Sequence, residues 1–301
     1  MSIYVEIFIC GDMESLWLKT QEPTLHQRWD LRFSEIAYLP RQPGQPQQFL
    51  YSTRIGAGLR INGEGESTGA RDGSSGERTS ALKFWSKDPK SLIEAGSGYW
   101  KYVPSADGIR FLTAYDYQTR FGALGRTIDK LIFRPLIGWA TAWSFDRLRL
   151  WIEQDVSPEV SRNQTLIYSL SRLAVAFIWL YHGLIPKILY RSPDELAMLS
   201  ATGMPASSVL TLTLLAGWLE IAFALLFLIF WRARWPLWLT IFALVAATLG
   251  VGISSPAYLH KAFDPLTLNL AVAALAACGL LAGTNLPSAK RCLRRPSEGK
   301  P

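Results

Sequence analysis

Hydrophobic and polar residues are distributed very differently in the two halves of this 301-residue chain. Four long apolar segments follow residue 164, at about 165–189, 209–231, 235–253 and 266–286. Each is long enough to cross a hydrocarbon layer of about 30 Å as a helix. Aromatic residues typical of membrane interfaces mark their ends, namely Tyr168, Tyr190, Trp231, Trp235, Trp238 and Tyr258. The pattern predicts four membrane-spanning helices.

The first half has the patterns of a mixed α and β domain. Alternating apolar residues predict a strand at 3–10, and Asp12 is placed to cap a helix at 13–20. A second helix is expected from Pro23. Further strands are expected at 33–39, 48–55, 59–65, 77–86, 93–103 and 109–121, with loops at 40–46 and 69–76. A long helix at about 124–152, kinked near Pro135, is expected to end the domain.

The distribution of charge supports this division. Residues 1–164 contain 20 Lys and Arg against 19 Asp and Glu, whereas residues 165–288 contain only 6 and 4. We therefore expect a soluble domain at 1–155, a linker at 156–164, a membrane domain at 165–288 and a basic cytoplasmic tail at 289–301. The short loops with most Lys and Arg would lie on the side of both termini, which predicts an inner (plasma) membrane protein with both termini in the cytoplasm. The excess of +7 forms no basic patch, so no nucleic-acid partner is expected.

Four polar residues are expected inside the membrane domain, namely Arg172, His182, Glu220 and Asn269. Charges at such positions are costly and usually face the interior of a helical bundle. The helical rise places Arg172 and Glu220 within about 6 Å of each other in depth, and His182 near the level of Asn269. Two interpretations stay open: an Arg172–Glu220 pair that only holds the bundle together, or a polar core that binds a ligand, a quinone or a proton.

Aromatic side chains with polar tips recur on the predicted strands, and such residues around a concave surface would suit an amphipathic ligand. The candidate ligand-binding residues are Tyr51, Trp85, Tyr99, Phe111, Tyr115 and Tyr117. The alternative is that these side chains pack into a filled core.

The sequence gives no basis for a catalytic centre. It has no nucleophile elbow, P-loop, dinucleotide fingerprint or zinc spacing. Three histidines and three distant cysteines indicate no metal site. His26 has no carboxylate or hydroxyl partner recognised from its spacing, so no catalytic residue is predicted. No cofactor is identified, although a quinone in the membrane domain stays open, and enzymatic activity is less expected than binding.

The soluble domain resembles the SRPBCC (START-like, helix-grip) superfamily. One strand, two short helices, a run of antiparallel strands and a long helix is the element order of that superfamily, and residues 12–17 (DMESLW) and 24–30 (TLHQRWD) resemble its membrane-associated or polyketide-cyclase-like members. The resemblance covers about residues 1–152. It implies an α+β helix-grip fold, a curved antiparallel sheet around a long C-terminal helix, with an apolar cavity for a lipid, a sterol, a polyketide or a similar molecule.

The membrane domain resembles the DoxX-like family. Residues 181–187 (YHGLIPK) and 263–265 (FDP), with four spans and a glutamate in the second, carry this resemblance over about residues 165–286. It implies an all-α four-helix transmembrane bundle.

These features predict an integral membrane protein whose cytoplasmic helix-grip domain binds a hydrophobic or amphipathic small molecule next to the bilayer. The expected partners are membrane lipid and that ligand, and a homo-oligomer is an open alternative. Two other functions stay open, a quinone-linked membrane redox subunit and a small-molecule transporter that acts as an oligomer. The absence of a cofactor motif disfavours the first, and the absence of inverted repeats disfavours a stand-alone transporter.

Overall fold

The computed structural model describes residues 2–41, 43–56, 58–261 and 264–296. The chain forms two compact units. The first unit contains residues 1–161 together with the segment from Pro287 onward, and the second contains residues 162–286.

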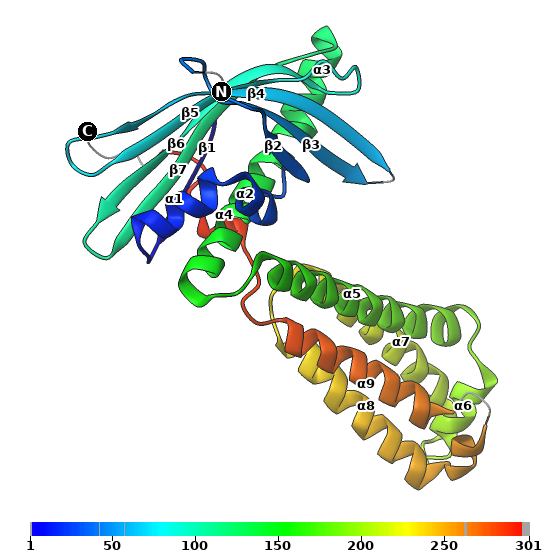
Figure 1. Ribbon diagram of the computed structural model, residues 1–301. Helices are drawn as coiled ribbons and strands as arrows, with labels where there is room; N and C mark the ends of the chain where they lie inside the picture. The colour runs from blue at the N-terminus through cyan, green and yellow to red at the C-terminus, as the bar shows by residue number, and fades with distance from the viewer. Residues whose placement is uncertain (1, 42, 57, 262–263, 297–301) are drawn as a thin grey trace. The chain divides into compact units, whose positions relative to one another are not determined.

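A seven-stranded antiparallel sheet forms the frame of the first unit (Figure 1). Its strands lie in the order β1-β7-β6-β5-β4-β3-β2, so β1 and β2 are the two edges. The bounds are β1 (Ile3–Ile9), β2 (Glu35–Tyr38), β3 (Gln48–Gly56), β4 (Leu59–Asp72), β5 (Arg78–Trp85), β6 (Ile93–Ser105) and β7 (Gly108–Thr119).

The strand β4 is longer than expected, because the predicted loop at 69–76 is partly strand. Pairing with β5 continues to Asp72 opposite Arg78, with a bulge between Ser67 and Gly69. Gly69 has a φ of +132°, which glycine adopts without strain. Backbone pairing in this hairpin needs no alternation of apolar and polar residues, so the hydrophobic pattern did not predict the extra length of β4.

Four helices complete the first unit, namely α1 (Met13–Gln21), α2 (Pro23–Trp29), α3 (Gly122–Ile128) and α4 (Arg134–Gln154). Asp12 caps α1 as predicted, accepting a hydrogen bond of 2.7 Å from the Ser15 amide. The long helix is interrupted by a π-helical turn at Asp129–Phe133, immediately before Pro135. In Figure 1, α4 runs along the concave side of the sheet. The predicted helix-grip arrangement is therefore confirmed.

Residues 287–296, here called the C-terminal strap, pack within the first unit. Leu293 and Glu6 exchange two backbone hydrogen bonds of 2.9 Å, which extend the sheet at the free edge of β1. The Ser288 amide donates to the buried Asp146 carboxylate of α4 at 2.6 Å. Cys292 is buried, with its Sγ 3.2 Å from the Ala142 carbonyl oxygen. The expectation of a separate tail at 289–301 is therefore corrected for its described part.

Among its described residues, the second unit contains four helices long and apolar enough to cross a membrane, as predicted. They are α5 (Pro158–His182), which continues as a π-helical segment at Gly183–Leu189, then α7 (Ala206–Ile229), α8 (Trp235–Ser254) and α9 (Pro265–Ala282). The short α6 (Pro193–Ser200) joins the first two spans. Because α5 begins at Pro158, the linker expected at 156–164 is mostly helix. Asp264 caps α9 at the Thr267 amide, whereas Phe263 of the FDP motif lies outside the described residues.

Candidate functional site

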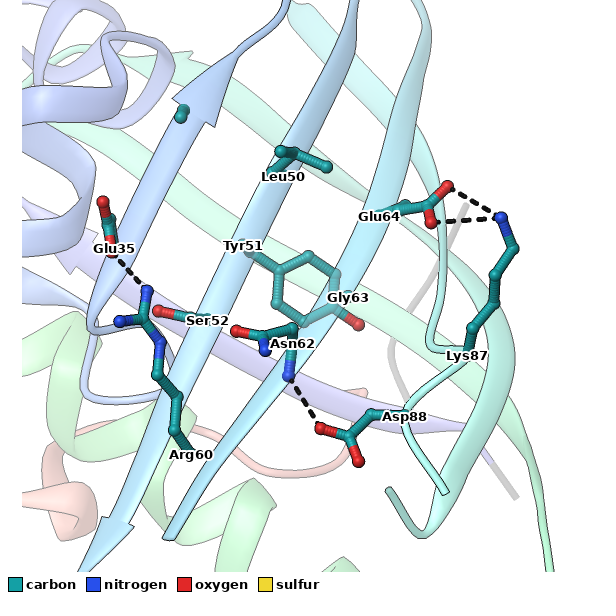
Figure 2. Close-up of a pocket in the computed structure, with 11 residues that line it drawn as sticks. Glu35, Leu50, Tyr51, Ser52, Arg60, Asn62, Gly63, Glu64, Lys87 and Asp88 are labelled. Atoms are coloured by element: carbon teal, nitrogen blue, oxygen red, sulfur yellow. Dashed lines mark hydrogen bonds and ion pairs between the residues drawn. The ribbon is translucent and has the colours of Figure 1, made fainter. Parts of the chain in front are cut away.

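A pocket of about 490 Å³ lies over β2, β3 and β4 (Figure 2). Strand alternation places most of its lining side chains, including Leu50, on the sheet face opposite α4. Two ion pairs line it, with Arg60 2.5 Å from Glu35 and Lys87 3.1 Å from Glu64, while Asp88 accepts from the Asn62 and Lys90 amides. The pocket thus combines ion-paired side chains with the apolar side chains of Ala37 and Leu50.

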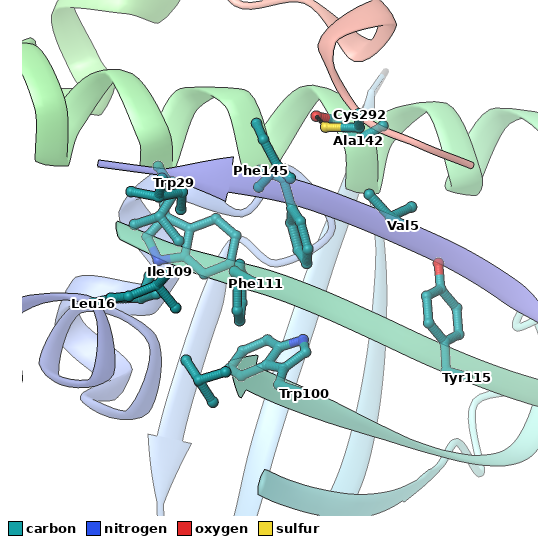
Figure 3. Close-up of a cluster of buried hydrophobic side chains, with 14 of the residues drawn as sticks. Val5, Leu16, Trp29, Trp100, Ile109, Phe111, Tyr115, Ala142, Phe145 and Cys292 are labelled. Carbon is teal, nitrogen blue, oxygen red and sulfur yellow. Dashed lines mark hydrogen bonds between the residues drawn. The ribbon is translucent and has the colours of Figure 1, made fainter. Parts of the chain in front are cut away.

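The six predicted ligand-binding residues do not form one surface. Phe111, Tyr115 and Tyr117 are buried in the core between β6, β7 and α4. Figure 3 shows Phe111 against Phe145 of α4, and their rings stack 4.5 Å apart. Since α4 fills this part of the concave face, the filled-core interpretation holds for these three residues.

Two of the remaining candidates lie on the opposite face of the sheet. Tyr99 is 40% exposed there, and Trp85 donates from its indole nitrogen to Glu64 at 3.1 Å. The register of β4, β5 and β6 sets this orientation, and it cannot be read from the sequence of a single strand. Tyr51 is the one candidate that remains half-buried on the α4-facing side, in a different part of the sheet.

Tyr51 belongs to a run of four aromatic rings joined by three contacts, here called the aromatic row, formed by Tyr38, Phe49, Tyr51 and Phe33. Ring centroids are 6.3 Å apart for Tyr38 and Phe49, 6.4 Å for Phe49 and Tyr51, and 5.5 Å for Tyr51 and Phe33. Tyr38, at the sheet edge, is 48% exposed. Burial raises the pKa of Tyr51 to about 12, so its hydroxyl stays protonated. The row thus extends from the surface toward the interior.

Two glycines of β4 allow the rings of the row to lie close to the sheet. A Cβ atom at Gly63 would be 2.1 Å from the Tyr51 ring, and one at Gly65 would be 2.3 Å from the Phe49 ring. Any larger residue at either position would displace the aromatic side chain that covers it. The position of the Phe49 and Tyr51 rings over the sheet therefore depends on glycine at both positions of β4.

The inner end of the row meets a buried group of ionisable residues, here called the polar cluster, formed by His26, Asp30, Arg32 and Tyr115. The Phe33 ring lies 5.3 Å from the His26 ring and joins the row to the cluster. Asp30 accepts hydrogen bonds from Arg32 Nε at 2.9 Å and Nη2 at 2.6 Å, and its Oδ2 lies 3.0 Å from His26 Nε2. The Arg32 guanidinium also lies 5.4 Å from the Tyr115 ring.

Burial dominates the electrostatics of the polar cluster. It lowers the pKa of His26 despite the nearby Asp30 carboxylate, so the imidazole is neutral at pH 7. Burial alone would raise the pKa of Asp30, but the Arg32 guanidinium and the His26 hydrogen bond hold it well below its ordinary value. Asp30 is fully buried and the Arg32 side chain is 13% exposed. With one carboxylate and one guanidinium, the cluster has no net charge.

Sequence reasoning missed this cluster, although its signal is present. Asp30 follows His26 by four residues, which brings the two side chains together at the end of α2, and Arg32 follows two residues later. The prediction that His26 has no carboxylate partner is therefore wrong. No group of three or more His, Cys, Asp or Glu side chains suited to a metal ion occurs in the described part of the chain.

In the second unit, the predicted contact between Arg172 and Glu220 is wrong. The buried Arg172 guanidinium donates to the carbonyl oxygens of Phe227 at 2.8 Å, Phe230 at 2.9 Å and Ala233 at 2.8 Å. These carbonyls lie at the C-terminal end of α7 and just beyond it. Arg172 therefore satisfies orphan acceptors at a helix end, where a cation is also favoured by the helix dipole.

Glu220 has a different partner, which the sequence reasoning did not consider. Its carboxylate lies 3.1 Å from the Lys187 ammonium as an ion pair without a well-aligned hydrogen bond. Lys187 also lies 3.5 Å from Glu195 of α6 and 3.5 Å from the His182 carbonyl oxygen. The π-helical segment changes the direction of Lys187, which an uninterrupted helix would not predict. Asn269 is separate, since its amide donates to Thr248 at 2.9 Å.

A family model and a curated protein match parts of this chain. The model of the DoxX-like family matches residues 176–277. The uncharacterized membrane protein YndG of Bacillus subtilis (strain 168) is 52% identical over 182 residues, which cover 60% of this chain and 68% of YndG.

Two solved structures resemble part of the chain at low sequence identity. The STAR-related lipid transfer protein from Xanthomonas axonopodis is 13% identical, with 50% of this chain and 85% of that chain covered and a TM-score of 0.38. The Zhui aromatase/cyclase from Streptomyces sp. R1128 is 11% identical, with coverages of 52% and 98% and a TM-score of 0.39.

Proposed function

This chain belongs to the family of the membrane protein YndG and contains a DoxX-like segment, and we propose that its first unit is a membrane-tethered binding domain for an amphipathic small molecule. The ligand would place its apolar body along the aromatic row and its polar end at the polar cluster. Four membrane spans keep such a domain at the bilayer, where hydrophobic molecules are concentrated.

The observation that carries this proposal is the continuity of the aromatic row with the polar cluster. Half-buried aromatic side chains lead from the exposed Tyr38 to a group that contains the fully buried Asp30. Ligand sites typically combine a mainly apolar lining with a few fixed polar groups that orient the ligand. The row and the cluster together supply both parts on one face of the sheet.

The charge balance of the cluster defines the polar end of the ligand. A charged group placed beside the compensated Asp30–Arg32 pair would itself be uncompensated in a largely buried site, which is costly. A hydroxyl or carbonyl group would need only a hydrogen bond. The ligand class is therefore a lipid, a polyketide or a quinone-like molecule with an uncharged polar end.

The orientation in the membrane is also a proposal. Arg232 and Arg234 lie in the short connection between α7 and α8, and Arg291, Arg294 and Arg295 follow α9. Four spans return the chain to the side it left, and the positive-inside rule makes that side the cytoplasm. The first unit would then face the cytoplasm from the inner membrane.

A photolabelling experiment on the full chain in lipid nanodiscs tests the proposed function. The probe is a photoactivatable long-chain alcohol, and labelled peptides are mapped by mass spectrometry. We expect label in residues 33–56, reduced about tenfold or more by Tyr51→Glu, since 1.4 kcal/mol corresponds to a factor of ten and a charge in an apolar site costs at least that much. Tyr99→Glu on the opposite face is the matched control and should leave the labelling unchanged. Equal labelling in both variants would contradict the proposal.

A further inference from the structure

A second buried group of charged residues lies in the membrane-spanning unit and has no part in the proposed binding domain. Lys187, Glu195 and Glu220, here called the lysine–glutamate cluster, come from the π-helical segment, α6 and α7. Their side chains are 11%, 28% and 20% exposed, respectively.

A close crossing of two backbones holds this cluster together. A Cβ atom at Gly183 would lie 2.5 Å from the Gly217 carbonyl oxygen, and one at Gly217 would lie 2.9 Å from the Gly183 carbonyl oxygen. Only glycine fits at both positions. The crossing brings Lys187 against α7 at Gly217, which is about one helical turn before Glu220. The course of the two backbones therefore places Lys187 beside Glu220.

Glu220 is the member of the cluster that lies deepest in its span. Glu220 is nine residues from the end of α7 at Ile229, or about 14 Å at 1.5 Å per residue. Since the hydrocarbon core is about 30 Å thick, Glu220 is near its middle if α7 ends at the interface. Ionisable residues at such depth are expensive and commonly belong to proton or ion pathways.

The charges of the cluster do not balance. One ammonium faces two carboxylates, and His182 of α5 precedes Lys187 by five residues, with its carbonyl oxygen 3.5 Å from the Lys187 ammonium. Asp194 is engaged with Lys261 at 3.0 Å outside the cluster. An unbalanced carboxylate in a low-dielectric interior is unfavourable, and one proton removes the imbalance.

We propose that the lysine–glutamate cluster is a reversible proton-binding site in the membrane unit. Glu220 takes up a proton from solvent to become a neutral carboxylic acid, and Lys187 then pairs with Glu195. On release of the proton, Lys187 returns to the Glu220 carboxylate. The buried Glu220 Oε2 lies 3.1 Å from the Lys187 ammonium but accepts no well-aligned hydrogen bond, so protonation there replaces an ion pair and breaks no hydrogen bond.

Infrared difference spectroscopy of the full chain in lipid nanodiscs tests this site. We expect a carbonyl band of a protonated carboxylic acid that grows as the pH falls and is absent in Glu220→Gln. Glu195→Gln should move the midpoint of this band to lower pH, because Lys187 then pairs only with Glu220. Lys187→Met should move it to higher pH, because the stabilising cation is lost.

Asp194→Asn is the control, since Asp194 is paired with Lys261 outside the cluster, and it should leave the band unchanged. A band that persists in Glu220→Gln would overturn the proposal. Midpoints that do not move in opposite directions in Glu195→Gln and Lys187→Met would also overturn it, and this second criterion holds even if Glu220→Gln does not fold.

Discussion

Replacement of Leu293 by proline should loosen the C-terminal strap measurably. The Leu293 amide donates to the Glu6 carbonyl oxygen at 2.9 Å, and its carbonyl oxygen accepts from the Glu6 amide at 2.9 Å. Proline has no amide hydrogen, so the first bond is lost outright. The residue before a proline must be extended, and Cys292 already is, with φ −97° and ψ 141°. The loss is therefore confined to the pairing with β1.

The size of this effect follows from the two bonds. Each net backbone hydrogen bond contributes about 1 kcal/mol, and the substitution removes one and weakens the other. Strap opening should become easier by about 1–2 kcal/mol, which corresponds to about 5- to 30-fold in the opening equilibrium.

The Cys292 thiol reports this opening. It is buried in the closed strap, and burial raises its pKa to about 12, so it is protonated and unreactive at neutral pH. In a background with Cys10→Ser and Cys278→Ser, its alkylation by a maleimide should be about 5- to 30-fold faster in Leu293→Pro. Leu293→Ala is the matched control, because it keeps both backbone bonds and the Leu293 side chain is 51% exposed. Equal rates in the two variants would refute the role of the strand pairing.

Three further predictions concern the two units. Because burial lowers the pKa of His26, the unfolded chain binds a proton that the folded unit does not, so the stability of the folded unit should fall as the pH drops below about 6.5. His26→Gln should make the melting temperature less dependent on pH. An unchanged pH dependence would count against a buried neutral imidazole. Arg172→Met should lower the melting temperature of the full chain in detergent. Adding Glu220→Gln should not raise it again, since the two residues have different partners. A raised melting temperature in the double variant would instead support the Arg172–Glu220 pair expected from the sequence. Gly63→Ala should cost about 1–3 kcal/mol and displace Tyr51, visible as reduced photolabelling, whereas an unchanged variant would show that the ring is free to move.

The sequence predicted the elements of both units more reliably than their contacts. Alternation located β1, and Asp12 marked the start of α1, because caps and strand periodicity are local properties. The four spans were predictable because length and apolar content determine them. The extension of β4 to Asp72 was not predicted, because pairing with β5 stabilises it and the local sequence has no strand pattern there.

Contacts between elements were predicted poorly, for reasons that individual residues make clear. Depth along a regular helix placed Glu220 nearest Arg172, but Arg172 pairs with helix-end carbonyls and the π-helical segment brings in Lys187. Trp85 and Tyr51 were expected on one surface, but the register places them on opposite faces. The strap was missed because Leu293 pairs with a residue 287 positions away, and only the folded chain brings them together.

Native mass spectrometry of the full chain, released from mild detergent without added ligand, tests the central claim most directly. The account predicts an adduct whose mass fits an uncharged amphipathic molecule, retained in Tyr99→Glu and lost in Tyr51→Glu. An adduct that survives Tyr51→Glu would contradict binding along the aromatic row. A chain that carries no adduct and also fails to bind the long-chain alcohol in the photolabelling experiment would contradict it as well.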